Sequence, residues 1–359
     1  MEIRHLILAA VFLLASCSVQ ERNTVVSVRG NQFFINGEPT CRGRYWKGNK
    51  IEGLLLNSRM VQGIFDDLNP KTRSRFAYPD TKIWDPERNT DEFVSHMKEW
   101  HDNGLLAFTL NMQGGSPVGY GNSEWINSAY DETGELRPDY IERLGKILDM
   151  ADELGMVVIL GYFYFGQDQY LKDEEAVLKA TDNITRWILE NKYRNILVEI
   201  NNECNIRYDH EILQPGRVDE LIRRVQQAGK DVSRLLVSAS FGGGTVPAEN
   251  VAAASDFILI HGNGQDRHSQ VVGLIEATKK LPGAANKPIL FNEDDHYDFD
   301  SDSCNFVTAV KAYVSWGYFD YRMDGEGFES GYQSVPVDWG INSDRKKSFF
   351  GKLREITME

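Results

Sequence analysis

Two short apolar stretches of this chain each end in an asparagine followed by a glutamate. The first reads ILVEINNECN over residues 196–205 and contains Glu203, and the second reads PILFNEDDH over residues 288–296 and contains Glu293. Apolar, β-branched runs that stop at polar clusters are typical of buried parallel strands. The carboxyl ends of such strands open onto the site of a parallel α/β fold. Two glutamates delivered to one such edge can supply the acid and the nucleophile that cleave a glycosidic bond.

The two carboxyl groups need different protonation states for this chemistry. Burial and mutual repulsion are expected to raise the pKa of Glu203, while hydrogen bonds keep Glu293 ionised. Groups that interact this strongly titrate as one unit. Asn202 is expected to reach the sugar 2-hydroxyl, and His261 to orient a carboxylate or bind substrate. Glu199, which shares the strand parity of Glu203, is interpreted as part of a satisfied buried ion pair or hydrogen-bond network.

Strand and helix patterns alternate along the chain without a linker between them. A single (β/α)8 TIM barrel over residues 25–359, with an N-terminal β-hairpin and long βα loops, accounts for this order. The alternative, an open doubly wound sheet, would carry a Gly-rich phosphate fingerprint in its first βα turn, and none is present. The eight expected strands cover residues 53–61, 105–111, 156–165, 196–202, 235–240, 257–261, 288–292 and 318–322.

Turn and cap residues locate several other elements. The hairpin is expected over residues 25–39, with turns at Gly30-Asn31 and Asn36-Gly37. Asn89 is expected to cap the first barrel helix, with Glu92 three residues on. Residues 62–89 show no clear period and predict a large loop over one face, which would partly close the pocket and favour either action on chain ends or short oligosaccharides as substrates.

The first residues resemble an export signal. Residues 1–16 carry Arg4, an apolar core and small residues before Cys17, which predicts a bacterial lipoprotein signal with Cys17 as the lipidated residue. An ordinary signal cut nearby is the alternative. A short tether over residues 17–24 would then link the catalytic domain to the membrane of the bacterial envelope. The apolar run is too short for a transmembrane anchor.

The amino-acid composition limits the classes of binding partner. The net charge is −14, and no basic stripe is present, which argues against nucleic acid as a partner. Beyond Cys17, only Cys41, Cys204 and Cys304 remain, and this sparse set is not a disulfide framework. The sequence does not determine whether any pair is bridged, nor the oligomeric state.

The strand order and the Asn202-Glu203 and Glu293 motifs resemble clan A glycoside hydrolases, the barrel superfamily that includes the family 5 cellulases and mannanases. The FFINGEP hairpin is also similar to the opening of the family. The resemblance covers nearly the whole predicted domain, at the level of strand order and a few residues. It implies that Glu203 is the acid/base and Glu293 the nucleophile of a retaining enzyme, with carbohydrate as substrate and no cofactor.

Three positions depart from that family pattern and place the chain in a divergent branch. Cys204 stands where a proline usually follows the acid/base glutamate, and of the His-x-Tyr of strand six only His261 is present. The strand-eight tryptophan has no counterpart, and Tyr321, Arg322 or Asp324 would hold its place. These departures concern the subfamily and the substrate more than the chemistry.

Other polar and aromatic residues at expected strand ends are candidate substrate contacts. An arginine at a strand end could bind the carboxylate of an acidic sugar or form an ion pair with carboxylates of the protein. Two alternatives to hydrolysis remain: a carbohydrate-binding barrel without turnover, or a metal-dependent hydrolase or lyase that uses the Glu293–His296 cluster. The full set of predicted substrate-binding residues is Arg59, Asn111, Tyr162, Asn202, His261, Tyr321 and Arg322.

Overall fold

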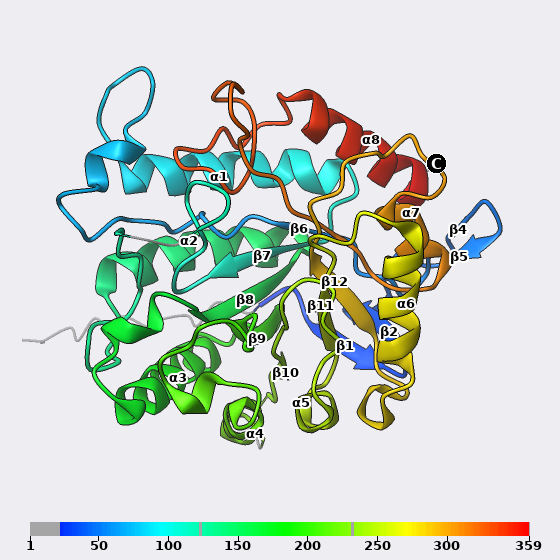
Figure 1. Cartoon of the computed structure of the whole chain (residues 1–359), viewed down its shortest axis with the longest axis horizontal. Helices are drawn as coiled ribbons and strands as arrows, with labels where there is room; N and C mark the ends of the chain where they lie inside the picture. The colour runs from blue at the N-terminus through cyan, green and yellow to red at the C-terminus, as the bar shows by residue number, and fades with distance from the viewer. Residues whose placement is uncertain (1–21, 122–123, 231–232, 359) are drawn as a thin grey trace, which may run out of the picture.

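Parallel strands surrounded by helices form the framework of the computed structural model, which describes residues 22–121, 124–230 and 233–358. The helices follow one another around the central strands (Figure 1). The predicted signal and Cys17 lie outside these described residues. The central strands are β6 (Asn57–Arg59), β7 (Ala107–Asn111), β8 (Val157–Tyr164), β9 (Ile196–Asn202), β10 (Leu236–Ser238), β11 (Ile258–His261), β12 (Ile289–Glu293) and β13 (Gly317–Tyr318).

The helices alternate with these strands, as the sequence predicted. Four 3-10 turns, η1 (Arg73–Phe76), η2 (Asp168–Tyr170), η3 (Glu211–Leu213) and η4 (Pro282–Ala284), lie in the connections. Within the described part of the chain, no helix has the length and apolar character that crossing a bilayer requires. The helices are α1 (Pro86–Asp102), α2 (Pro138–Leu154), α3 (Glu174–Glu190), α4 (Val218–Ala228), α5 (Glu249–Ala254), α6 (His268–Lys279), α7 (Asn305–Lys311) and α8 (Asp344–Thr357).

Hydrogen bonds join the central strands into a closed ring. Six of them pair in the order β10-β9-β8-β7-β6-β13, and β11 pairs with β12. A parallel bridge between Leu290 and Ser315 connects β12 to the segment before β13. On the other side, the amide of Asp256, just before β11, donates to the carbonyl of Val237 in β10 at 2.9 Å. The (β/α)8 barrel is therefore confirmed, and the open doubly wound sheet is excluded.

The N-terminal hairpin closes the bottom of this barrel. It comprises β1 (Val26–Arg29), β2 (Gln32–Ile35) and the short β3 (Glu38–Pro39), and a second small hairpin follows with β4 (Tyr45–Trp46) and β5 (Asn49–Lys50). Fully buried Phe33 packs edge-on against Phe257, with ring centroids 6.2 Å apart. Both rings belong to an apolar cluster that also contains Leu55, Ala107 and Val157, which lie at or just before the starts of barrel strands. This cluster fills the amino-terminal end of the barrel, so the opposite end is left for a site.

Several predicted element boundaries were wrong: the first barrel strand, for example, was predicted over residues 53–61 and is β6 (Asn57–Arg59). Two others have a clear local cause. Helix α1 begins at Pro86, because the side chain of Asp85 accepts from the amides of Glu87 and Arg88, both at 3.1 Å. Asn89, the predicted cap, is buried inside the helix. The last strand was predicted over residues 318–322 but ends at Tyr318, because the next amide, of Phe319, donates to the carbonyl of Asp294.

Candidate active site

The two glutamates meet at the open end of the barrel. Glu293 is the last residue of β12, and Glu203 comes directly after β9. The Nδ1 atom of His261, at the end of β11, lies 3.0 Å from Oε1 of Glu203 and 3.6 Å from Oε2 of Glu293. One oxygen of each glutamate and this nitrogen lie within 4.8 Å of one another. The arrangement brings two carboxylates and an imidazole into one small volume.

The backbone at Glu203 turns sharply to present the side chain there. Its φ is 53°, in the left-handed region that side-chain-bearing residues seldom adopt, at a cost of about 1–3 kcal/mol. Ser240, just past β10, holds the turn: its hydroxyl accepts from the amide of Glu203, and its carbonyl accepts from the amide of Cys204, both at 2.9 Å. Strain that is braced in this way at a strand end is common at functional sites.

A buried arginine faces Glu293. Arg59, at the end of β6, is 1% exposed, and its Nε lies 3.0 Å from Oε2 of Glu293. The other oxygen, Oε1, accepts from Nδ2 of Asn263 at 3.0 Å. Burial raises the pKa of Glu293, and the charges of Arg59 and His261 act against that rise. Glu293 is thus an almost fully buried carboxyl group with the guanidinium of Arg59 held against it and the imidazole of His261 close by.

The directions of the two pKa shifts are the reverse of those predicted. Burial alone would raise the pKa of Glu203, but the hydrogen bond and the charge of His261 lower it below its usual value. His261 is held cationic in turn: burial lowers its pKa, and the two nearby glutamates raise it further than burial lowers it. The prediction failed because it considered the two carboxyls alone, and the histidine gives its hydrogen bond to Glu203.

Two of the predicted substrate contacts are buried polar residues at strand ends of the barrel. Asn111 and Asn202 are each 1% exposed, at the ends of β7 and β9. Gly161 makes room for Asn111, because a Cβ at Gly161 would lie 2.3 Å from its Oδ1. Glu199 accepts a hydrogen bond from Nδ2 of Asn292 at 3.2 Å through Oε2, but its buried Oε1 has no hydrogen-bond partner among the described residues, so the predicted network is only partly satisfied. The barrel interior is therefore polar around Gly161, where the side chains of Asn111 and Glu199 come together.

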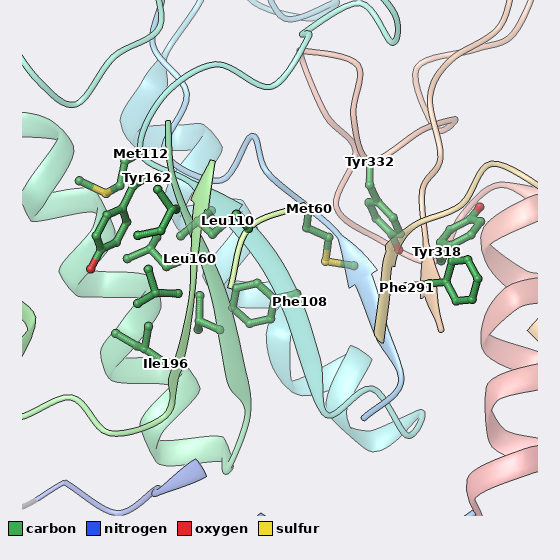
Figure 2. Packing of buried hydrophobic residues seen from close by; sticks show 14 of the residues in the cluster. Met60, Phe108, Leu110, Met112, Leu160, Tyr162, Ile196, Phe291, Tyr318 and Tyr332 are labelled. Carbon is green, nitrogen blue, oxygen red and sulfur yellow. The ribbon is translucent and has the colours of Figure 1, made fainter. Parts of the chain in front are cut away.

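Two of the predicted contacts lie elsewhere. Tyr162 points away from the barrel interior, and its hydroxyl lies 3.2 Å from that of Thr185 in α3. Figure 2 shows it beside Met112 in the apolar packing. Arg322 uses its Nη2 atom to bind the carbonyls of Phe328, Ser334 and Pro336, so it fastens the loop after β13.

Tyr120 and Asn263, which the sequence did not single out, complete the rim together with Tyr164, an aromatic residue that the sequence suggests for stacking on a sugar ring. Tyr120, in the loop after β7, donates from its hydroxyl to Oδ2 of Asp295 at 2.5 Å and accepts from Nδ2 of Asn263 at 2.7 Å. Its ring lies edge-on to that of the predicted contact Tyr321, with centroids 5.1 Å apart. Buried Tyr164, at the end of β8, is close enough to Arg59 and both glutamates for their charges to act on its pKa, which burial raises.

The acidic cluster after Glu293, Asp294 to His296, is already held by contacts within the protein. Asp294 is fully buried; its Oδ2 accepts from Nε1 of Trp316 at 2.9 Å, and its Oδ1 lies 2.6 Å from Nδ1 of His296. Burial lowers the pKa of His296, but Asp294 and its acidic neighbours raise it to about 9. These contacts support the end of β12 and leave few free ligand atoms for a metal. At the other cluster, of Glu203, His261 and Glu293, the guanidinium of Arg59 repels a cation.

By sequence, no family model and no curated protein matches this chain. Its structure is similar to many solved ones. The endo-1,4-beta-mannanase from Rhizomucor miehei has a TM-score of 0.57 at 12% identity, and the match covers 93% of this chain and 100% of that one. The chain has the fold of these proteins.

Two further solved structures give the same result. A broad specificity endoglucanase from Bacteroides salanitronis matches with a TM-score of 0.53 at 11% identity, over 86% of this chain and 94% of that one. A family 5 mannosidase from Rhizomucor miehei matches with a TM-score of 0.52 at 13% identity, over 94% and 98%. The similarity to family 5 barrels that the sequence suggested is therefore present in the structure, over nearly the whole chain.

Proposed function

We propose that this protein is a retaining glycoside hydrolase in which Glu293 is the nucleophile and Glu203 the acid/base. The observation that carries the proposal is the approach of the two carboxylates to within 4.8 Å at the open end of the barrel. Retaining enzymes hold their two carboxyl groups about 5–5.5 Å apart, and inverting enzymes about 6.5–9.5 Å, because a water molecule must fit between them. The 4.8 Å bound applies to the nearest oxygens of the two carboxyl groups, and so close an approach favours the retaining arrangement with its covalent intermediate.

The reaction has two steps. Ionised Glu293 attacks the anomeric carbon and forms a glycosyl ester, while the bond to the leaving oxygen breaks and Glu203 gives that oxygen a proton. Glu203, now a carboxylate, then takes a proton from water as that water attacks the same carbon and releases Glu293. The Arg59 guanidinium stabilises Glu293 as an anion before the first step and as a leaving carboxylate in the second.

Substrate binding is expected to move a proton from His261 to Glu203, which must be protonated for the first step. In the free protein, the proton of the Glu203–His261 pair lies on the imidazole, which holds the pKa of Glu203 low. A sugar seated over Glu203, whose side chain is 15% exposed, removes its remaining water and favours the neutral acid. The proton then passes from Nδ1 of His261 across the 3.0 Å contact to Glu203.

The fall of kcat/KM at low pH, the acid limb of its pH profile, should report the protonation of Glu293. Because burial raises its pKa, kcat/KM is expected to fall on acidification at a pH above the usual glutamate value. Arg59→Met removes a cation that favours the ionised form, so the acid limb should move upward by roughly 1–3 pH units. Arg224→Met, which loses only an ion pair with Asp182 on the outer surface, should leave the limb in place. If the acid limb of Arg59→Met lies at the same pH as that of the unmodified protein, the ion pair between Arg59 and Glu293 does not set the pKa of the nucleophile.

Turnover on aryl β-glycosides and on β-linked oligosaccharides tests the function itself. The similar solved structures include a mannanase, a mannosidase and an endoglucanase, so β-mannosides and β-glucosides are the first substrates to assay. Proton NMR of the first product formed should show the β-anomer, because two inversions restore the configuration. The α-anomer as first product would exclude the covalent route, and no hydrolysis of any glycoside would exclude the function.

We also propose that the protein acts at the bacterial envelope, anchored through a lipid on Cys17. The support is the signal-like pattern of residues 1–16 with its small residues before Cys17. Full-length protein expressed in a bacterium grown with labelled palmitate should carry the label, and Cys17→Ser should abolish it while leaving the signal uncut. Label retained in Cys17→Ser, or no label on the unmodified protein, would contradict lipidation at this residue.

A further inference from the structure

The loop after β7 crosses the open end of the barrel and is fastened on the far side. Its segment 113–121 is held by the long loop after β13: Nε2 of Gln333 donates to the carbonyl of Ser116 at 3.1 Å, and the amide of Val335 donates to the carbonyl of Pro117 at 2.8 Å. Gly119 passes flush against Tyr321, since a Cβ at Gly119 would lie 2.7 Å from that ring. The segment is therefore a fixed part of the rim.

Tyr120 completes the crossing. Its hydroxyl bonds to Asp295, beyond β12, and to Asn263, beyond β11, while its ring packs edge-on against Phe319 and Tyr321, beyond β13. Burial and the nearby charge of Glu293 raise the pKa of Tyr120, so the hydroxyl keeps the proton that it donates. A loop from the second barrel strand is thus joined to loops from the sixth, seventh and eighth strands.

This bridge bonds directly to the side chain of Glu293, and no hydrogen bond within the described part of the chain joins Glu203 to Tyr120, Asn263 or Asp295. One amide nitrogen, Nδ2 of Asn263, reaches both Oε1 of Glu293 at 3.0 Å and the hydroxyl of Tyr120 at 2.7 Å. The partners of Glu203 come instead from β10 and β11: the hydroxyl of Ser240, the backbone amide of Gly243 and His261. The predicted closing loop, residues 62–89, supports the loop after β7 from outside: Gln62 donates to the carbonyl of Gly115, and the amide of Leu68 donates to the carbonyl of Ile126.

We propose that the Tyr120–Asn263–Asp295 bridge makes the site a blind pocket for one terminal sugar, so that the protein removes single sugars from the non-reducing ends of chains. This inference rests on the proposed function. The sugar whose anomeric carbon is attacked must lie over Glu293, and the scissile oxygen must lie at Glu203. A chain that continued beyond that sugar, away from Glu203, would have to pass through the bridge. The rest of the chain leaves on the open side, past β9 and β10.

Product analysis with end-labelled chains tests the inference. Manno- and gluco-oligosaccharides of three to six β-linked sugars, labelled with a fluorophore at the reducing end, are incubated with the full chain and sampled early. Release of unlabelled monosaccharide, with labelled products shortened one sugar at a time, is the expected result. Early labelled fragments shortened by two or more sugars would overturn the inference while leaving the proposed function intact. If neither these chains nor aryl glycosides are cleaved, the proposed function fails and the inference fails with it.

Tyr120→Ala separates the bridge from the chemistry. Removing the ring and its hydroxyl should open the pocket, so that the ratio of monosaccharide to longer released fragments falls by ~10-fold or more, while aryl glycosides are still cleaved. Val118→Ala is the matched control, because Val118 is 52% exposed on the same segment; its product ratio should equal that of the unmodified protein. A ratio unchanged in Tyr120→Ala would show that the bridge does not limit chain position.

Discussion

Glu293→Gln is expected to lower kcat on every cleaved glycoside by about 10⁴-fold or more, because no other described carboxylate can form the covalent intermediate in its place. Glutamine keeps the size of the side chain and can still accept from Asn263, but it has no charge to offer the anomeric carbon or Arg59. The loss should be as large for a dinitrophenyl glycoside as for an oligosaccharide, since both need the nucleophile. Steady-state kinetics on both substrates measures it.

Two controls make this loss interpretable. Glu211→Gln changes an exposed glutamate in η3, in the loop after β9, and should leave kcat unchanged. Thermal unfolding of Glu293→Gln should show a folded protein, because the substitution removes a buried group whose pKa is raised by burial. Turnover within about ten-fold of the unmodified protein would refute the assignment of Glu293.

Glu203→Ala is expected to lower kcat on oligosaccharides by about 10²–10⁴-fold, because their leaving oxygen needs a proton in the first step. A dinitrophenyl leaving group needs no proton, so its release in the first step should continue, and the slow step becomes hydrolysis of the glycosyl ester. A burst of dinitrophenol equal to the enzyme concentration should therefore precede slow turnover. Stopped-flow absorbance measures this burst.

Added azide tests the role of Glu203 as general base in the second step. A small anion in the space of the missing carboxylate attacks the glycosyl ester without a general base, so azide should restore dinitrophenyl glycoside turnover in Glu203→Ala and yield the β-glycosyl azide. The unmodified protein, in which Glu203 occupies that space, should not respond. An α-glycosyl azide, or equal losses on both leaving groups without rescue, would contradict the acid/base role of Glu203.

The barrel itself could be predicted because its local signals agree with one another. Strand β9 spans Ile196–Asn202, as predicted, because an apolar run there ends abruptly at polar residues. Gly155 ends α2 in the left-handed conformation at φ 76°, as a glycine after an apolar stripe indicates. The start of α1 was missed because Asp85-Pro86, the stronger start signal, precedes the apolar period that marks the helix.

The site was only partly predictable, because some of its contacts join distant loops. Glu203 and Glu293 follow from strand ends alone. The contact of Tyr120 with Asn263 joins loops 143 positions apart, and no periodicity reports such a pairing. The only local signals were the glycines on either side of Tyr120 and the position of Asn263 two residues after His261. Tyr162 was assigned to the site by its aromatic type, although Gly161 is the residue that faces the barrel interior.

The most direct test of the account is to trap the glycosyl ester. An activated 2-deoxy-2-fluoro-β-glycoside of the sugar that the protein cleaves forms this ester and hydrolyses it slowly, since fluorine destabilises both transition states. After proteolysis, mass spectrometry should find one added glycosyl group on the peptide that contains Glu293, and none in Glu293→Gln. A glycosyl group on Glu203 or on any other residue, or no adduct on a protein that hydrolyses the parent glycoside, would contradict the account.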